Sequence, residues 1–160
     1  MIEKLWEFSD AQALPSATTV IATKIIDWSA AGSQYLDMMN SGMELWVVVM
    51  VNTVPTGTSA VVKCYQHSTT TITSGDLLDT GDIRAVAYMS ANAQSIHHIL
   101  YARELSGLLA SAMAFDGTTD RYFGLAYTAV GNCTDGKVDA WLQVGKPVMP
   151  TTQVNTSNIT

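Results

Sequence analysis

The chain has 160 residues, a length that suits one domain whose core needs neither disulfides nor metal. Charged residues make up only 14% and the formal net charge is −6, so we expect partners to cover part of the uncharged surface. The eight Lys and Arg residues are scattered, which argues against nucleic acid or anionic membrane as a partner. The N-terminus mixes acids with apolar residues, unlike a secretion signal, and no apolar segment reaches transmembrane length.

The first half of the chain predicts four strands separated by turn formers. These short runs are rich in β-branched and aromatic residues and cover residues 18–27, 44–52, 59–67 and 83–90. A turn with Pro55 and Gly57 lies between the second and third runs, so we expect these two to form a hairpin. In the third run the predicted faces are Val61, Lys63 and Tyr65 on one side, and Val62, Cys64 and Gln66 on the other.

The second half continues in the same manner after a turn predicted at Asp79-Thr80-Gly81-Asp82. Residues 96–115 partly fit a helical spacing, but Ser106-Gly107 interrupts it, so two strands joined by a loop are equally consistent and are favoured. Strands over residues 122–130 and 137–144 follow, and Asp135-Gly136 between them predicts a tight hairpin. Seven or eight short strands predict an all-β fold, a jelly-roll-like sandwich or barrel with extended terminal arms.

We expect one β-sandwich domain over residues 1–145, with residues 1–17 as an N-terminal arm, and an extended tail over residues 146–160. Two prolines set the start of the tail, and residues 151–160 hold almost no apolar side chain. The candidate partner-binding residues are apolar residues of these arms: Trp6, Phe8, Val148 and Met149. An alternative of equal weight is that Trp6 and Phe8 plug one end of their own barrel.

No set of reactive groups converges in the sequence, so we expect no catalytic residues, no metal and no cofactor. Cys64 and Cys133 are expected to be free thiols. On a strand His97 and His98 would point to opposite faces, unlike a pair of metal ligands. No nucleophile or phosphate-loop motif occurs. The acids show neither calcium-loop spacing nor a pairing for glycoside hydrolysis: Glu44, Asp76, Asp79, Asp82, Glu104, Asp116 and Asp120.

Aromatic residues bear on a second function class. Four of them lie inside strand-like segments, where core packing is favoured: Trp46, Tyr122, Tyr127 and Trp141. A lectin-like jelly roll would instead present aromatic rings on exposed loops to stack on sugars, for which Trp28 and Tyr35 are candidates. A carbohydrate-binding jelly-roll module is therefore the alternative to a structural protein.

Four segments carry a resemblance to a known family. In chain order they are Glu7-Phe8-Ser9-Asp10-Ala11-Gln12-Ala13-Leu14, Ile25-Ile26-Asp27-Trp28, Gly42-Met43-Glu44-Leu45-Trp46-Val47-Val48-Val49 and Asp120-Arg121-Tyr122-Phe123-Gly124-Leu125-Ala126-Tyr127-Thr128. Their order and spacing resemble the capsid cement, or decoration, proteins of Bordetella-phage-like short-tailed bacteriophages. The opening octapeptide and the Arg-Tyr-Phe strand are the more specific parts, and the match extends from about residue 7 to about residue 144.

The resemblance implies a non-enzymatic, jelly-roll-like protein on the exterior of the virion. Such proteins bind the outer surface of a shell of HK97-type major capsid protein and tie its subunits together. The resemblance also implies a homo-oligomer, with a dimer expected, made in the cytoplasm of the bacterial host. Departures from the family pattern lie between residues 77 and 115 and in the tail after Gly145.

Overall fold

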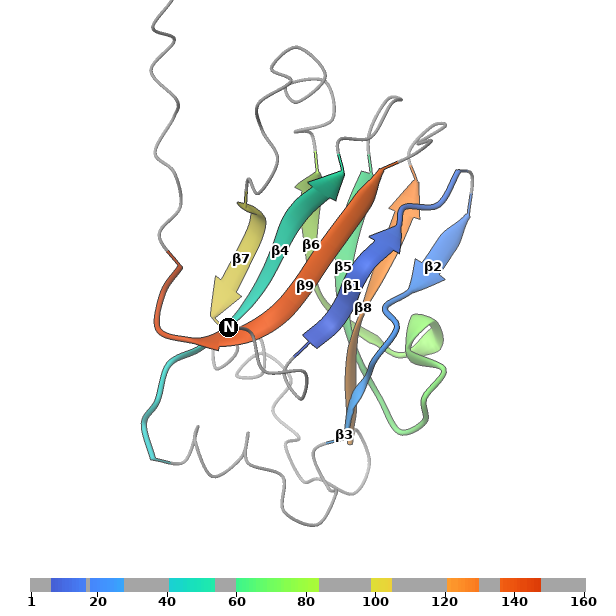
Figure 1. Cartoon of the computed structure of the whole chain (residues 1–160). Helices are drawn as coiled ribbons and strands as arrows, with labels where there is room; N and C mark the ends of the chain where they lie inside the picture. Colours follow the sequence, from blue (N-terminus) through green and yellow to red (C-terminus); the bar gives the residue numbers. More distant parts are fainter. Residues whose placement is uncertain are drawn as a thin grey trace, which may run out of the picture.

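The computed structural model describes residues 7–16, 18–27, 41–53, 60–83, 99–104, 121–129 and 136–147. These residues form two antiparallel sheets that lie face to face (Figure 1). Sheet A has the order β1 (Glu7–Ala13), β9 (Lys137–Val144), β4 (Leu45–Thr53) and β7 (Ile99–Glu104). Sheet B has the order β2 (Thr19–Ile21), β8 (Tyr122–Ala129), β5 (Ala60–His67) and β6 (Asp76–Ile83), with β3 (Ile26–Asp27) as a further partner of β8. The prediction of an all-β sandwich is confirmed.

The strand pairs are nested along the chain. β5 pairs with β6, β4 with β7, β2 and β3 with β8, and β1 with β9, so that each pair encloses the one before it. The lateral pairs of β4 with β9 and of β5 with β8 then roll this long ribbon into two sheets. The result is the jelly-roll-like arrangement expected from the number and spacing of the strands.

Both predicted hairpins are wrong, because the two strands of each predicted pair belong to different sheets. β4 belongs to sheet A and β5 to sheet B, and β8 and β9 are divided in the same way. The turn predicted at Asp79–Asp82 is also wrong, since these residues lie within β6, opposite β5. The first predicted strand divides into β2 and β3, and β7 is the described part of residues 96–115. Residues 84–90, predicted as a strand, lie outside the described residues.

Part of the expected N-terminal arm belongs to the sandwich itself. Glu7–Ala13 form β1 at the edge of sheet A, where they pair with β9. Ala11 has a φ of 46°, and its N–H donates to the carboxylate of Asp139 at 2.7 Å, in the stretch where the register with β9 shifts. Asp139 also accepts from the side-chain amide of Asn52, so β1, β9 and β4 are joined at this point.

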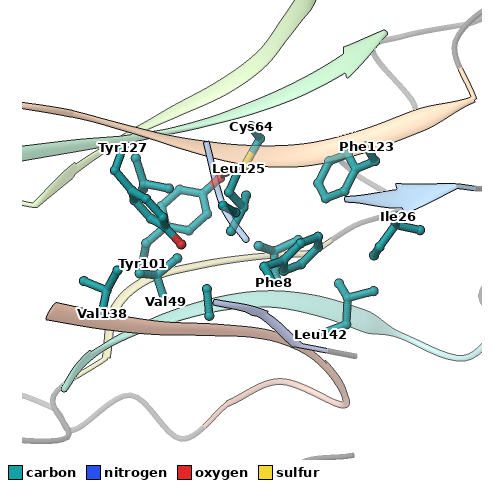
Figure 2. Close-up of a cluster of buried hydrophobic side chains, with 14 of the residues drawn as sticks. Phe8, Ile26, Val49, Cys64, Tyr101, Phe123, Leu125, Tyr127, Val138 and Leu142 are labelled. Atoms are coloured by element: carbon teal, nitrogen blue, oxygen red, sulfur yellow. Dashed lines mark hydrogen bonds between the residues drawn. The ribbon is translucent and has the colours of Figure 1, made fainter. Parts of the chain in front are cut away.

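The core lies between the inner faces of the sheets (Figure 2). Phe8 is 1% exposed and meets Phe123 edge to face, with ring centroids 5.7 Å apart. Phe8 therefore fills the core of its own domain, which is the second of the two roles considered for it. Alternation in β5 is as predicted, with Val62 and Cys64 in the core and the odd-numbered residues facing outward.

Three of the four aromatic residues expected in the core lie outside it, since Trp141, although only 8% exposed, also points away from sheet B. Trp46 and Tyr122 are half-buried and face outward, because the residues that follow them, Val47 and Phe123, point inward. Tyr127 is in the core as predicted. The prediction that Trp46 and Tyr122 are largely buried in the core is wrong. Side chains of a strand alternate between its two faces, and the neighbouring residues are the ones that face the core.

Candidate functional site

The outer face of sheet A, turned away from sheet B, carries a second apolar layer. We call Trp46, Val48 and Met50 of β4, Ala102 of β7 and Trp141 of β9 the A face. Val48 is 0% exposed, and Ala102 and Trp141 are each 8% exposed, although none belongs to the core between the sheets. The indole N–H of Trp46 is shielded from solvent without an acceptor among the described residues. The A face is therefore a largely buried apolar surface, with Trp46 and Met50 half-buried.

β9 ends in a hydrogen-bonded turn that fixes where the tail leaves the sandwich. Gly145 has a φ of +78°, a conformation that favours glycine, and its N–H donates to the carbonyl of Glu44 at 2.8 Å. The side chain of Gln143 accepts from the indole N–H of Trp141 and donates to the carbonyl of Gly145, both at 3.2 Å. Pro147 is buried. The tail thus begins beside the start of β4.

The outer face of sheet B is more open. We call Val61, Lys63 and Tyr65 of β5, with Leu77 and Thr80 of β6, the B face; the register places Leu77 opposite Tyr65 and Thr80 opposite Lys63. Leu77 is 52% exposed, and the three β5 residues are half-buried. Within this set only Lys63 is charged, and the register places one acid, Asp82, opposite Val61. The B face is a nearly neutral surface made of aliphatic, phenol and hydroxyl groups.

One end of the outer surface of sheet B is closed by a short 3₁₀ turn, η2 (Ile72–Ser74). Ile72 is fully buried, and a Cβ added to Gly124 would lie 2.6 Å from its Cδ1 atom and 3.3 Å from Ile25. Only glycine therefore lets Ile72 reach the strand. The imidazole of His67 accepts from the N–H of Thr69 at 2.8 Å and holds the start of this segment.

Inside the sandwich, polar groups tie the sheets together and leave no exposed nucleophile at Cys64. The thiol of Cys64 lies 3.1 Å from the hydroxyl of Tyr101, which donates to Asp79 at 2.7 Å; Asp79 also pairs with Arg103. Burial raises the pKa of Cys64 to about 12. Burial is also the main cause that raises the pKa of Tyr101, and the neighbouring Cys64 raises it further. At neutral pH the thiol is protonated and unreactive.

A second tie connects β1 to sheet B. The hydroxyl groups of Ser9 and Tyr127 are 2.9 Å apart, and Ser9 also donates to the side chain of Gln12. Gln12 in turn donates to the carbonyl of Ile21 and accepts from the N–H of Thr23. Burial raises the pKa of Tyr127. These contacts fix the edges of the sandwich.

The described residues contain no group of three or more His, Cys, Asp and Glu side chains placed to hold a metal ion. Across the same ranges there is no helix with the length and apolar character of a membrane span. Glu44 is exposed before β4 and Glu104 ends β7, whereas Asp79 serves the internal tie to Tyr101.

Most of the predicted partner-binding residues lie outside the described residues, namely Trp6, Val148 and Met149, and so do Cys133, His97, His98, Trp28, Tyr35, Asp116 and Asp120. Phe8 is in the core. The B face was not singled out from the sequence, although alternation had already placed Val61, Lys63 and Tyr65 together on one side of a strand. Leu77 joins them only through the pairing of β5 with β6, which turn signals did not reveal.

Comparison of the sequence with protein-family models finds no matching family, and comparison with curated proteins finds no match.

Proposed function

We propose that this protein is a non-enzymatic capsid cement protein that binds the outer surface of a phage shell and bridges its major capsid protein subunits. The resemblance in sequence supports the proposal, and three of the four segments that carry it overlap principal strands of the sandwich, β1, β4 and β8. The observation that carries the proposal is the B face. It is a half-exposed, nearly neutral sheet surface that the domain does not use for its own core.

Such a surface suits adhesion to another folded protein better than it suits chemistry. Interfaces gain affinity from apolar and aromatic residues and from neutral hydrogen bonds, and their centres are depleted in charge. The B face offers Leu77, Tyr65 and Val61 for apolar contact and Thr80 for hydrogen bonding. Because Lys63 is the only charge among these five residues, and Asp82 opposite Val61 has the opposite sign, we expect capsid binding to depend weakly on ionic strength. Complete release of bound protein by moderate salt would contradict this expectation.

The decisive variant is Leu77→Asp in the full-length chain. It places a charge at the most exposed apolar residue of the proposed contact and should weaken binding about 10- to 100-fold, since burying a leucine contributes about 1.5–3 kcal/mol. Binding is measured by co-sedimentation with shells of the cognate major capsid protein. Met43→Asp is the matched control, because Met43 is 48% exposed but lies before β4, away from the B face. Equal affinity of the two variants would exclude the B face as the contact.

A carbohydrate-binding function is the second candidate, and one observation favours it. Tyr65 and Tyr122 both face outward on the paired strands β5 and β8, where they are diagonal neighbours. Aromatic rings placed in this way can stack on sugars. The guanidinium of Arg121 already lies 4.9 Å from the ring centroid of Tyr122, however, which leaves Tyr65 as the more accessible ring. Glycan binding that is lost in Tyr65→Ala, without any binding to shells, would favour this function over the first.

A further inference from the structure

Lys63 is a charged residue with neutral neighbours on every side of it in sheet B. β5 lies between β6 and β8, and the register places Lys63 opposite Thr80 of β6 and opposite Ala126 of β8 (Figure 1). Along β5 the residues before and after it on the same face are Val61 and Tyr65. A positive charge therefore lies among aliphatic, phenol and hydroxyl groups.

Lys63 makes no ion pair with any side chain that the structure describes. Three other cations do pair with acids: Lys24 with Glu7, Arg103 with Asp79 and Arg121 with Asp27. In the register the acid nearest to Lys63 is Asp82, which is diagonal to it rather than directly across. Lys63 is also half-buried, as expected for a lysine whose aliphatic stem lies along its neighbours while the ammonium group stays at the surface.

Two hydroxyl groups accompany this ammonium group. Thr80 is exposed directly across from Lys63, at a typical Cβ separation of about 5 Å, and Tyr65 is two residues further along β5, about 7 Å away. A carboxylate has two oxygens that accept hydrogen bonds, so one can face the ammonium group and the other the hydroxyl of Thr80. An enclosed ion pair is favourable only when such additional hydrogen bonds are made.

We propose that Lys63 binds a carboxylate of the capsid protein, an Asp or Glu side chain that the shell presents within an otherwise uncharged contact. This inference rests on the proposed function and adds the chemistry of the partner residue. The pair fixes the register of the contact, because a shell lysine or arginine at the same position would be repelled. It is compatible with weak salt dependence, since an enclosed pair is screened much less than an exposed one.

Zero-length crosslinking of the full-length chain bound to shells tests the contact directly. A carbodiimide joins an amine to a carboxylate, with loss of water, only where the two groups touch. We expect an amide between Nζ of Lys63 and one Asp or Glu of the shell protein, identified by mass spectrometry of the linked peptides. Lys137, exposed on β9 of sheet A, is the internal control and should stay unlinked. Shells that carry bound protein without any link at Lys63 would overturn the proposal.

Neutral and conservative substitutions measure what the charge contributes. Lys63→Met removes the charge but keeps an unbranched apolar side chain, and it should weaken co-sedimentation with shells at least about 10-fold. Lys63→Arg keeps the charge and should bind nearly as tightly as the unmodified chain. Equal affinity of Lys63→Met and the unmodified chain would overturn the proposal, and would leave Lys63 as a charge that only protects the sheet surface from aggregation.

Leu77→Asp distinguishes failure of this inference from failure of the proposed function. If Leu77→Asp weakens binding and Lys63→Met does not, the B face is the contact and only the role of Lys63 is wrong. If neither variant weakens binding, the B face is not the contact and the proposed function loses its support. Charge reversal completes the test: Lys63→Glu should abolish binding, and replacement of the linked shell acid by lysine should restore it. Binding that is not restored would overturn the pairing.

Discussion

Tyr101 and Tyr127 extend across the core in opposite directions, each ending on a partner in the other sheet (Figure 2). Tyr101 belongs to β7 at one edge of sheet A and reaches Cys64 of sheet B, whereas Tyr127 belongs to β8 of sheet B and reaches Ser9 on the other edge of sheet A. The two phenol groups thus hold opposite edges of sheet A against sheet B. Buried hydroxyl groups need such partners, because an unpaired one costs free energy.

Tyr101→Phe should lower the free energy of unfolding by about 1–2 kcal/mol, because it removes the donor to Asp79 and leaves the Cys64 thiol without its partner. Urea denaturation measures the change. Tyr127→Phe is the matched comparison and should cost less, since Ser9 keeps its hydrogen bond to Gln12. The opposite ranking of the two variants would show that the Tyr101 tie is not the stronger one.

The Cys64 thiol should make stability fall at alkaline pH. Its pKa is raised from 9.0 to about 12 by burial, so the unfolded chain releases this proton at lower pH than the folded chain does. The contribution is complete below about pH 9 and is lost as the pH rises from 9 through 12. Cys64→Ser, which does not titrate in this range, should show a shallower decline in free energy of unfolding between pH 8 and 10, measured under reducing conditions. Identical declines would mean that Cys64 is not protected in the folded state.

Gly124→Ala should lower the free energy of unfolding by about 1–3 kcal/mol, because the new methyl group would meet Cδ1 of Ile72 at 2.6 Å. Ile72→Val removes that very atom. In the double variant the cost should therefore be smaller than the sum of the two single costs, with a coupling of at least about 0.5 kcal/mol. Strictly additive costs in thermal or urea unfolding would show that the two residues do not compete for this space.

Trp46→Phe should leave the melting temperature unchanged or raise it. The substitution keeps an aromatic ring on the A face and removes an indole N–H that is shielded from solvent and has no acceptor in the described part of the chain. Trp46→Ala should instead destabilise by about 1–3 kcal/mol, because it removes the ring itself and its contact with Lys146. If Trp46→Phe were as damaging as Trp46→Ala, the N–H would have an important acceptor in the folded protein.

The local pattern of residue types in the sequence was sufficient to locate most strands, but it did not show which strands pair with each other. The β-rich runs predicted β4, β5, β8 and β9 to within one or two residues, because strand propensity and flanking turn formers are local properties. A turn signal shows only that the chain reverses. Whether the next strand stays in the same sheet or crosses to the other depends on which arrangement buries both inner faces, and that is a property of the whole chain.

For a related reason, the sequence did not show which residues of β4 face the core. Val47, Val48 and Val49 are all fully buried, so the apolar run carries no alternation that separates the core face from the outer face. The odd-numbered residues belong to the core, and Trp46 is therefore placed outside it. In β5 the outward positions include the charged residue Lys63, so the sequence itself indicates which residues face outward.

β9 lies between β1 and β4 in sheet A, so the last described strand occupies the middle of a sheet whose neighbours come from much earlier in the chain. Until β9 has been synthesised, β1 and β4 lack the strand that hydrogen-bonds to both of them. During that time the valines of β4 are exposed and can make non-native contacts. Pairings this distant in sequence close slowly, typically in milliseconds to seconds for all-β domains. The molecule should therefore fold after synthesis rather than during it, and lower growth temperature should improve its soluble yield.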